Sequence, residues 1–462
     1  MVRQEFFKPG NEVTPANLGE AIQQAIEIEI STIPVYLYTY YSINRTPNQD
    51  AISGIIAQKL IANGVPVAKA NNIALEISME FMVYANKAGA LIMSVAIEEM
   101  LHMALSSNLK QALAGLPELY GKSPAHYPAI LPGHEPEFKI DLAALSLDQL
   151  ITFLKIESPD PLPDFNRPML APIKYTTIGD FYNMIKTCIQ ENDLPFNTHS
   201  AQLIPGRGYY ASNNIDTVYY DKKHNPHFVN ADDSGDLIYV TNTESAVNAI
   251  NTIIDQGEGN QKIKGFNPDG TIDCPNPLVP GDFDDASKEE RCHFVKFREI
   301  YCEYKRLSHK VNGLGIGEID INSYFVINVP TNPRTSDYPE AIQPLSTLTN
   351  AIYTYIFVMV ENCYVVANNT QYELFMFGIH KSMIFILNSI ISALNGYTYK
   401  AADGKHYTIA PTFEDYPFGL FSSPKQQLVA LYNTVVVNFP EIAYLGGRIN
   451  DLPDVPIVNN NN

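Results

Sequence analysis

The sequence has no tryptophan, few cysteines and few charged residues. Its 462 residues include 0 Trp, 5 Cys and 18% charged side chains. No two cysteines form a CxxC pair, which argues against a zinc knuckle, and we expect free thiols in a reducing compartment. The Rossmann glycine pattern, the phosphate-binding loop and the GxSxG nucleophile motif are also missing. The chemistry of the chain must therefore come from other residue types.

Basic residues are scarce as well. The chain has 31 Lys and Arg against 50 Asp and Glu, a formal net charge of -19. Because this charge repels phosphate backbones and anionic lipids, we expect neither nucleic acid nor a membrane as a partner. The most apolar runs, 352–360 and 383–394, are shorter than the roughly 20 residues that span a bilayer. Residues 1–10 lack the apolar stretch of a signal peptide, so we expect a cytoplasmic protein.

Helical periodicity dominates the rest of the sequence. Apolar residues recur at helical spacing from 14 to 43, where Thr14 and Pro15 give a start signal. They recur again from 73 to 114, a stretch long enough to allow a break near 86–89. Further helices are predicted at 147–156, 178–191, 244–256, 285–307, 341–367, 371–395 and 424–437. The predicted fold class is therefore mostly α.

Prolines gather in residues 117–240, which we interpret as a long irregular insertion that holds only two short helices. A segment of this length is more often part of a functional site than a linker. Strand signals are weak and confined to 237–240 and 324–329. We predict a bundle over 1–320 that includes the insertion, and a C-terminal helical region over 321–462 that packs on the bundle.

Two predicted helices carry the same small motif, a glutamate followed three residues later by a histidine. The first is Glu99 to His102 and the second is Glu290 to His293. Residues three apart lie on one face of a helix, about one turn apart, so both side chains can reach the same metal ion. One such motif arises often by chance, whereas two in helical stretches favour a metal site.

Both motifs lie on helix faces with substantial apolar character, where an unpaired acid is costly. Helical bundles of the ferritin-like di-iron and di-manganese class use this arrangement: two helices supply Glu-x-x-His and two others supply one Glu each. Carboxylates and imidazoles suit iron or manganese, and bridging carboxylates hold two ions close together. The pattern therefore predicts a ferritin-like four-helix bundle with a long irregular insertion and additional C-terminal helices.

The bundle scheme requires a glutamate from the first helix. Glu29 shares a stripe with Ile22, Ile26 and Ile33, whereas Glu27 points about two residues away from that stripe. We therefore choose Glu29 as the ligand.

A glutamate is also needed from the helix that begins near 244. Glu244 stands at the helix start, where the helix dipole explains an acid. Asp255 is shorter and one turn away from the end. Glu258 stands between two glycines, which permit close backbone approach. It also precedes Glu290 by enough residues for one helix and a turn that brings the chain back to the site. We prefer Glu258 and keep Asp255 as the alternative.

At these residues the sequence resembles the ferritin-like domain of iminophenyl-pyruvate dimer synthases, which act in violacein- and rebeccamycin-type pathways. The likeness covers most of the chain, and the combination of EEMLHM, a QGEG after a helix and a downstream ExxH is fairly specific. Residues 53–85 look like an extension. The similar stretches are 25–37 (AIEIEISTIPVYL), 94–109 (SVAIEEMLHMALSSNL), 145–158 (LSLDQLITFLKIES), 177–186 (TIGDFYNMIK), 244–259 (ESAVNAINTIIDQGEG), 292–307 (CHFVKFREIYCEYKRL) and 348–360.

The resemblance implies a site and an activity. Carried over residue by residue, the metal ligands are Glu29, Glu99, His102, Glu258, Glu290 and His293. The implied protein is a di-metal oxidoreductase that holds two ions, iron or manganese, and acts with O2 on a small organic substrate. That substrate would be derived from an imino or amino acid of specialised metabolism, and the partners would be a second copy or another pathway enzyme.

Two other functions stay open on the sequence. A ferroxidase or iron-handling protein would share the metal site but would need no organic pocket. A structural protein would keep the ferritin-like fold with a vestigial site.

Overall fold

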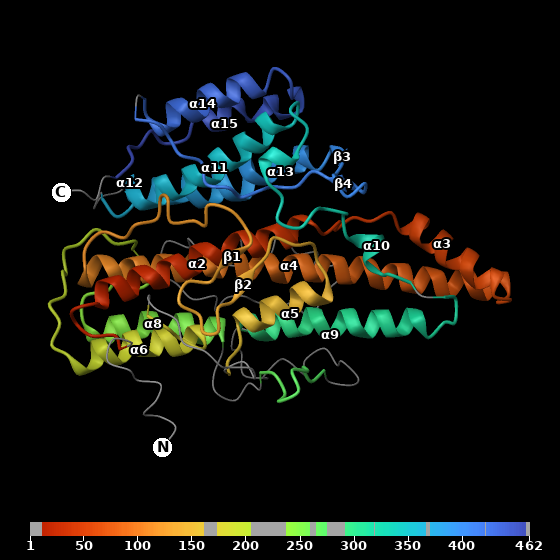
Figure 1. Cartoon of the computed structure of the whole chain (residues 1–462), viewed down its shortest axis with the longest axis horizontal. Helices are drawn as coiled ribbons and strands as arrows, with labels where there is room; N and C mark the ends of the chain where they lie inside the picture. Colours follow the sequence, from red (N-terminus) through yellow and green to blue (C-terminus); the bar gives the residue numbers. More distant parts are fainter. Residues whose placement is uncertain are drawn as a thin grey trace.

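The computed structural model describes most of the chain, and this part is almost entirely helical (Figure 1). The prediction of a mostly α fold is confirmed. The described residues are 12–160, 173–204, 237–258, 265–274, 292–317, 319–365, 370–420 and 422–458.

Two long helices, α2 (Leu18–Tyr41) and α4 (Val67–Leu113), lie side by side through the centre of the molecule. A third helix, α3 (Gln49–Ala62), connects them at one end and packs on α4. The predicted start at Thr14 is three residues early, because Thr14 forms a turn in which its backbone N–H donates to the Asn17 side chain at 2.7 Å. The helix then begins after Asn17.

Helix α4 continues for 47 residues, so the break allowed near 86–89 does not occur. Gly89 serves close packing instead, since a Cβ at that position would lie 2.9 Å from Cδ of Arg45. By length and composition α4 could cross a membrane, but its most apolar window is wholly buried inside the protein. It is the central core helix.

Four shorter helices cover one side of α2 and α4. They are α5 (Leu147–Ile156), α6 (Ile178–Glu191), α8 (Thr243–Gly257) and α9 (His293–Asn312). Helix α6 packs with α8 and α5 packs with α9, and α4 contacts both α8 and α9. Figure 1 shows one pair beside each half of the two long helices. The bundle is thus completed by two helix pairs whose inner ends face each other.

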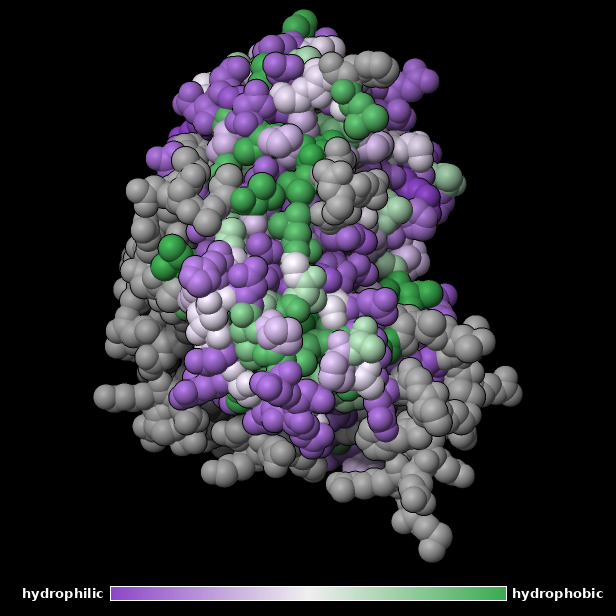
Figure 2. Space-filling view, turned by 90° about the vertical axis from the view of Figure 1, so that its left-hand side faces the viewer, coloured by the Kyte–Doolittle hydropathy of each residue, from purple (hydrophilic) through white to green (hydrophobic). Residues whose placement is uncertain are grey.

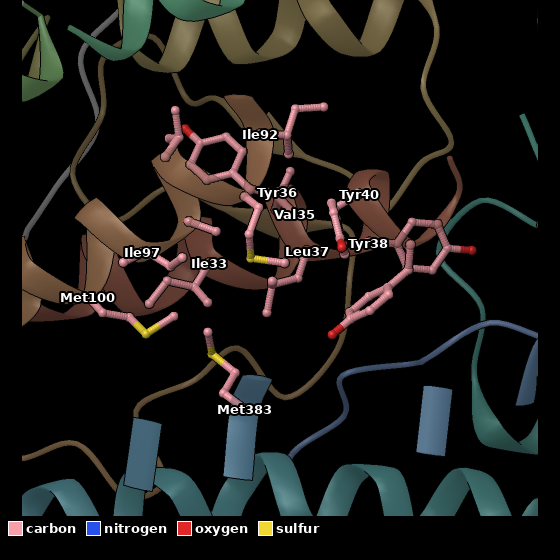
Figure 3. Packing of buried hydrophobic residues seen from close by; sticks show 14 of the residues in the cluster. Ile33, Val35, Tyr36, Leu37, Tyr38, Tyr40, Ile92, Ile97, Met100 and Met383 are labelled. Atoms are coloured by element: carbon pink, nitrogen blue, oxygen red, sulfur yellow. The ribbon is translucent and has the colours of Figure 1, made fainter. Parts of the chain in front are cut away.

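A third layer lies on the opposite side of α2 and α4 (Figure 1). Met383 of this layer points toward Met100, Ile97 and Ile33 (Figure 3). The predicted division at residue 320 stays a prediction. The layer contains α11 (Gln343–Asn362), α12 (Thr370–Met376), the π-helix η2 (Phe377–Leu387), α13 (Asn388–Leu394), α14 (Pro424–Val435), the 3-10 helix η3 (Pro440–Leu445) and α15 (Gly446–Asn450).

The strands predicted at 237–240 and 324–329 are wrong. Residues 237–240 pair with no strand among the described residues, and the second stretch begins inside the short helix α10 (Asn322–Phe325). The strands that do form are too short for any periodicity to reveal. They are β1 (Ala129–Ile130) with β2 (Lys139–Ile140), and β3 (Thr398–Lys400) with β4 (His406–Thr408), each pair antiparallel. A 3-10 turn, η1 (Thr335–Asp337), precedes the third layer.

The expectation that all five cysteines are free thiols is also wrong. Cys274, in the loop before α9, forms a disulfide with Cys302 inside α9. The two residues are 28 positions apart, and their spacing carries no signature, so only the fold brings their Cα atoms to 5.5 Å. Cys188, Cys292 and Cys363 are free and buried.

Apolar side chains from all three layers join in one continuous core. At the end of the molecule seen in Figure 2, apolar residues reach the surface as a narrow band between hydrophilic ones. Charged groups inside such a core are costly unless they are paired or bound to a metal. The buried acids of the bundle therefore need an explanation.

Candidate metal centre

Acids and histidines from five helices meet in the middle of the bundle. Two helices contribute from their interiors, and three contribute from their ends. All of these side chains are buried, with at most 6% of any residue exposed. They are Glu29 of α2, Glu99 and His102 of α4, Glu157 directly after α5, Glu258 directly after α8, and His293 at the first position of α9.

The two histidines share one acid between them. One ligand atom each of Glu99, His102 and His293 lies within 4.8 Å of the others. Nδ1 of His293 lies 2.9 Å from Oε1 of Glu99 and 3.4 Å from Oε2 of Glu157. The two imidazole rings stack with their centroids 5.1 Å apart. Carboxylate oxygens and imidazole nitrogens therefore converge on one small volume.

Each histidine presents Nδ1 to these acids and its other nitrogen to a different residue. Nδ1 of His102 lies 3.9 Å from Glu29 Oε2, and its Nε2 lies 3.1 Å from Oε1 of Gln256. Nε2 of His293 lies 2.9 Å from Oε2 of Glu98. Histidines that hold metals usually donate their second ring N–H to such a partner, which fixes the ring orientation.

Two tyrosines hold the carboxylates in place. The Tyr182 hydroxyl donates to Oε1 of Glu29 at 2.5 Å and lies 2.8 Å from the Ser106 hydroxyl. The Tyr36 hydroxyl donates to Oε1 of Glu157. Each hydrogen bond fixes the orientation of its carboxylate. It therefore also fixes the position of the carboxylate oxygen that the tyrosine does not contact.

The carboxyl groups compete for protons. Burial raises the pKa of Glu29 well above its usual value, and the neighbouring Glu99 raises it further. Burial and Glu99 likewise raise the pKa of Glu157. Burial also pushes the pKa of Glu99 upward, but hydrogen bonds with Glu29 and His293 outweigh it and lower that pKa to about 2. Several negative charges thus cannot coexist here without a compensating cation.

The two histidines differ in charge. Burial lowers the pKa of His102 to about 4, so its imidazole is neutral near neutral pH and keeps a lone pair for a ligand bond. Burial acts in the same direction on His293, but Glu157, Glu98 and Glu99 around it raise its pKa well above the usual value. Without a metal, His102 is thus already in the neutral form that a metal ion requires, whereas His293 must lose a proton when it binds an ion.

Glu258 approaches the same cavity from the end of α8. Its Oε1 accepts a hydrogen bond from the backbone N–H of Gly179 at 2.6 Å, and Oε2 lies 3.4 Å from the Thr177 hydroxyl. The carboxylate is therefore placed at the N-terminus of α6, where the helix dipole favours a negative charge. Burial nevertheless raises its pKa to about 8. The alternatives weighed on the sequence, Glu244 and Asp255, are exposed.

The sequence matches the family described as Ferritin-like over residues 22–302, more than half of the chain. The chain belongs to the ferritin-like family. A solved structure described as a ferritin like protein from Caulobacter vibrioides at 1.95 Å resolution has 17% sequence identity and a TM-score of 0.42. That comparison covers 80% of this chain and 97% of that chain. No curated protein matches the sequence.

The structure of this ferritin-like protein describes only the second half of the second motif. Glu290 lies outside the described residues, so its position is not assigned. Helix α9 begins only at His293, because Cys292 before it has the extended angles φ -66° and ψ 162°. The helix predicted over 285–307 is therefore confirmed only from His293 onward, and the placement of Glu290 on a face shared with His293 stays a prediction. His293 reaches the site from a helix N-terminus.

Three candidate residues of the metal centre were not predicted from the sequence. Glu157 follows a helix that was predicted correctly, but helical periodicity says nothing of a residue beyond the last turn. Glu98 directly precedes Glu99 on α4, and its Oε2 contacts Nε2 of His293, the ring nitrogen opposite the shared acids. Tyr182 lies on α6 far from either motif. The LKIES stretch that contains Glu157 already carried part of the family resemblance, and it is the signal from which Glu157 could have been predicted.

The donor set of the ferritin-like protein fits a metal. Carboxylate oxygens and imidazole nitrogens suit iron or manganese. Neither ring nitrogen of His293 makes a well-aligned hydrogen bond within the described part of the chain, although the ring is fully buried. Buried polar atoms left in this state are rare and need an explanation such as a missing ion. The narrower likeness to the dimer synthases stays a prediction.

Proposed function

We propose that this ferritin-like protein binds two metal ions, iron or alternatively manganese, and uses them with O2 to oxidise a small organic substrate. The observation that carries the proposal is the concentration of buried acids around two imidazoles whose Nδ1 atoms face the same volume. The proposed ligands are Glu29, Glu99, His102, Glu258 and His293, together with Glu290 as expected from the sequence and Glu157 as added from the geometry.

The charge balance supports two ions. Glu29, Glu99, Glu157 and Glu258 are all buried, and the cation Lys296 nearby is already paired with Glu98. Removing a single unpaired carboxylate from water costs several kcal/mol in practice. Two divalent ions would offset the four carboxylates while the histidines stay neutral.

The chain would control the reaction by position. A pair of such ions supplies O2 binding and electron transfer when bound. Tyr182 and Tyr36 fix one oxygen of Glu29 and of Glu157, so these carboxylates cannot rotate freely. The described ligands are all buried, which excludes bulk water and strengthens each electrostatic contact.

The cavity beside these acids is lined by both apolar and polar groups. Its free volume of about 10 Å³ holds roughly one water molecule, so a substrate would enter only with movement of the side chains around it. One wall is apolar and comes from Ile178 on α6 and from Ile253 and Ile254 on α8, while Glu258 and Tyr182 supply polar groups. A substrate derived from an imino or amino acid, as the family resemblance implies, would place its apolar part on that wall.

The test combines metal analysis with oxygen consumption. Protein loaded with Fe(II) in the absence of O2 is expected to bind two equivalents, and anomalous scattering should show two peaks about 3.5–4 Å apart. Glu99→Ala should lose both the metal and the oxygen consumption that imino or amino acid substrates stimulate, whereas Glu244→Ala on the exposed start of α8 should lose neither.

Two results would overturn the proposal. Fewer than one equivalent of iron, manganese or zinc under every loading condition would leave a vestigial site. Oxidation of Fe(II) with accumulation of ferric mineral, and no stimulation by any organic molecule, would favour an iron-handling protein.

A further inference from the structure

In each imidazole of the proposed metal centre, the nitrogen Nε2 faces away from the shared acids and toward a partner side chain. The two partners differ in charge. A carbonyl oxygen only accepts hydrogen bonds, so Oε1 of Gln256 at 3.1 Å requires a proton on Nε2 of His102. Behind His293 stands the carboxylate Glu98 at 2.9 Å. Both rings therefore present Nδ1 to the acids, but one is held by a neutral amide and the other by an acid.

Glu98 is itself fixed by a buried ion pair. Nζ of Lys296 lies 2.5 Å from Oε1 and 2.6 Å from Oε2 of Glu98. Lys296 stands one turn after His293 on α9, so the carboxylate, the ammonium and the imidazole form one rigid group between α4 and α9. Glu98 and Lys296 are 4% exposed each. A carboxylate held in this way cannot turn away from the ring.

An acidic acceptor makes an imidazole a stronger ligand than a neutral acceptor does. A negative charge 2.9 Å from Nε2 raises the electron density at Nδ1 through its electrostatic field, and carboxylate partners of histidine ligands change metal affinity by about 10–100-fold. Lys296 reduces the charge of Glu98 without removing it, and it holds the carboxylate at the ring.

We propose that the two metal positions are unequal: the ion bound by His293 is taken up first and more tightly, because Glu98 supports that imidazole and Gln256 supports the other. Glu98 and Gln256 are positioning residues, since each acts through a histidine. The inference rests on the proposed function, because it requires that both histidines hold metals.

The test is a titration of the metal-free protein with Co(II), followed by calorimetry and by the visible d–d absorption of the ion. We expect two steps that differ at least tenfold in affinity. Glu98→Gln keeps the size of the side chain and should weaken the first step about 10–100-fold, so that the two steps merge. Gln256→Glu is the reciprocal change and should tighten the second step while shifting its absorption.

Glu303→Gln is the matched control. Glu303 lies on the same helix as Lys296 and is also paired with a cation, Arg306, but it is not near the histidines. Glu303→Gln should leave both Co(II) binding steps unchanged. The control therefore distinguishes a general effect of removing an acid from the α4–α9 interface from a specific effect on His293.

The outcomes separate this inference from the proposed function. If the wild type binds two Co(II) ions with equal affinity, the inequality is wrong and the di-metal site stands. If it binds no Co(II), the proposed function fails first. Should Glu98→Gln fold poorly, Gln256→Glu decides alone, because unchanged affinity and spectrum in that variant overturn the inference.

Discussion

Glu258 occupies the space in which residue 179 would carry a side chain. A Cβ built on Gly179 would lie 2.1 Å from Oε2 of Glu258, and the backbone N–H of Gly179 donates to Oε1 at 2.6 Å. Gly179→Ala must therefore push the carboxylate out of the cavity, although alanine is the better helix former. We expect the variant to lose metal affinity about tenfold or more, measured by Fe(II) or Co(II) titration, while its helical content is retained.

Gly54→Ala in α3 is the control for this substitution. No atom lies within 4 Å of a Cβ at that position, so the change should leave metal affinity intact and stabilise the helix by about 0.5–1 kcal/mol. Unchanged metal binding by Gly179→Ala would remove Glu258 from the ligand set.

We expect Glu157→Gln to weaken metal binding and to stabilise the metal-free protein. Burial and Glu99 raise the pKa of the Glu157 carboxyl, so its ionised form opposes folding at neutral pH in the absence of metal. The amide keeps an oxygen for the Tyr36 hydroxyl but removes the charge. We expect the metal-free variant to be more thermostable than the wild type, and to gain less from added metal.

The comparison is thermal unfolding with and without Fe(II) or Mn(II). Glu191→Gln, an exposed acid at the end of α6, should change neither value. A Glu157→Gln protein that is stabilised by metal as much as the wild type would show that Glu157 is no ligand.

Helix interiors and capped helix starts were predictable from the sequence, whereas the site residues just beyond helix ends were not. The bounds of α5 and α6 follow from the apolar period and from the caps Ser146 and Thr177, whose side chains accept from Gln149 N and Asp180 N. Glu29 was likewise placed on the buried face of its helix by periodicity alone. The physical reason is local: both signals depend on neighbours within one or two turns.

The remaining parts of the site arise from tertiary contacts. Glu157 and His293 meet although they are far apart in sequence, because the end of α5 and the start of α9 converge on the same acids. No period extends across such a junction. The same limit explains why the predicted start of this helix was too early: the apolar period gave no sign that the backbone at Cys292 is extended.

Glu361 should make the stability of the metal-free protein fall as pH rises. It lies on α11, and its Oε2 accepts from the backbone N–H groups of Leu119 and Tyr120 at 3.1 and 2.8 Å. Burial raises its pKa to about 7, despite these hydrogen bonds. An unfolded chain loses this proton near pH 4.5, so between about pH 4.5 and 7 the folded state binds more protons and the free energy of unfolding falls.

The full loss is on the order of 3 kcal/mol and is complete above pH 7. Glu361→Gln removes it while keeping an acceptor oxygen. Urea unfolding at pH 5 and pH 8 should therefore show a variant that gains stability over the wild type only at the higher pH. Glu340→Gln, an exposed acid before α11, should show a difference that does not change with pH. A pH-independent difference for Glu361→Gln would contradict the prediction.

The disulfide between Cys274 and Cys302 should stabilise the part of the chain that carries His293. It closes a loop of 28 residues, for which the chain-entropy relation gives about 3–4 kcal/mol. The double variant Cys274→Ser/Cys302→Ser should therefore unfold at lower temperature than the oxidised wild type. Dithiothreitol should lower the wild type to the same value and leave the variant unchanged, since the other cysteines are free and buried. Because His293 lies inside the closed loop, metal affinity should fall together with stability. Equal unfolding temperatures for the oxidised wild type and the variant would show that the α9 start is held by packing alone.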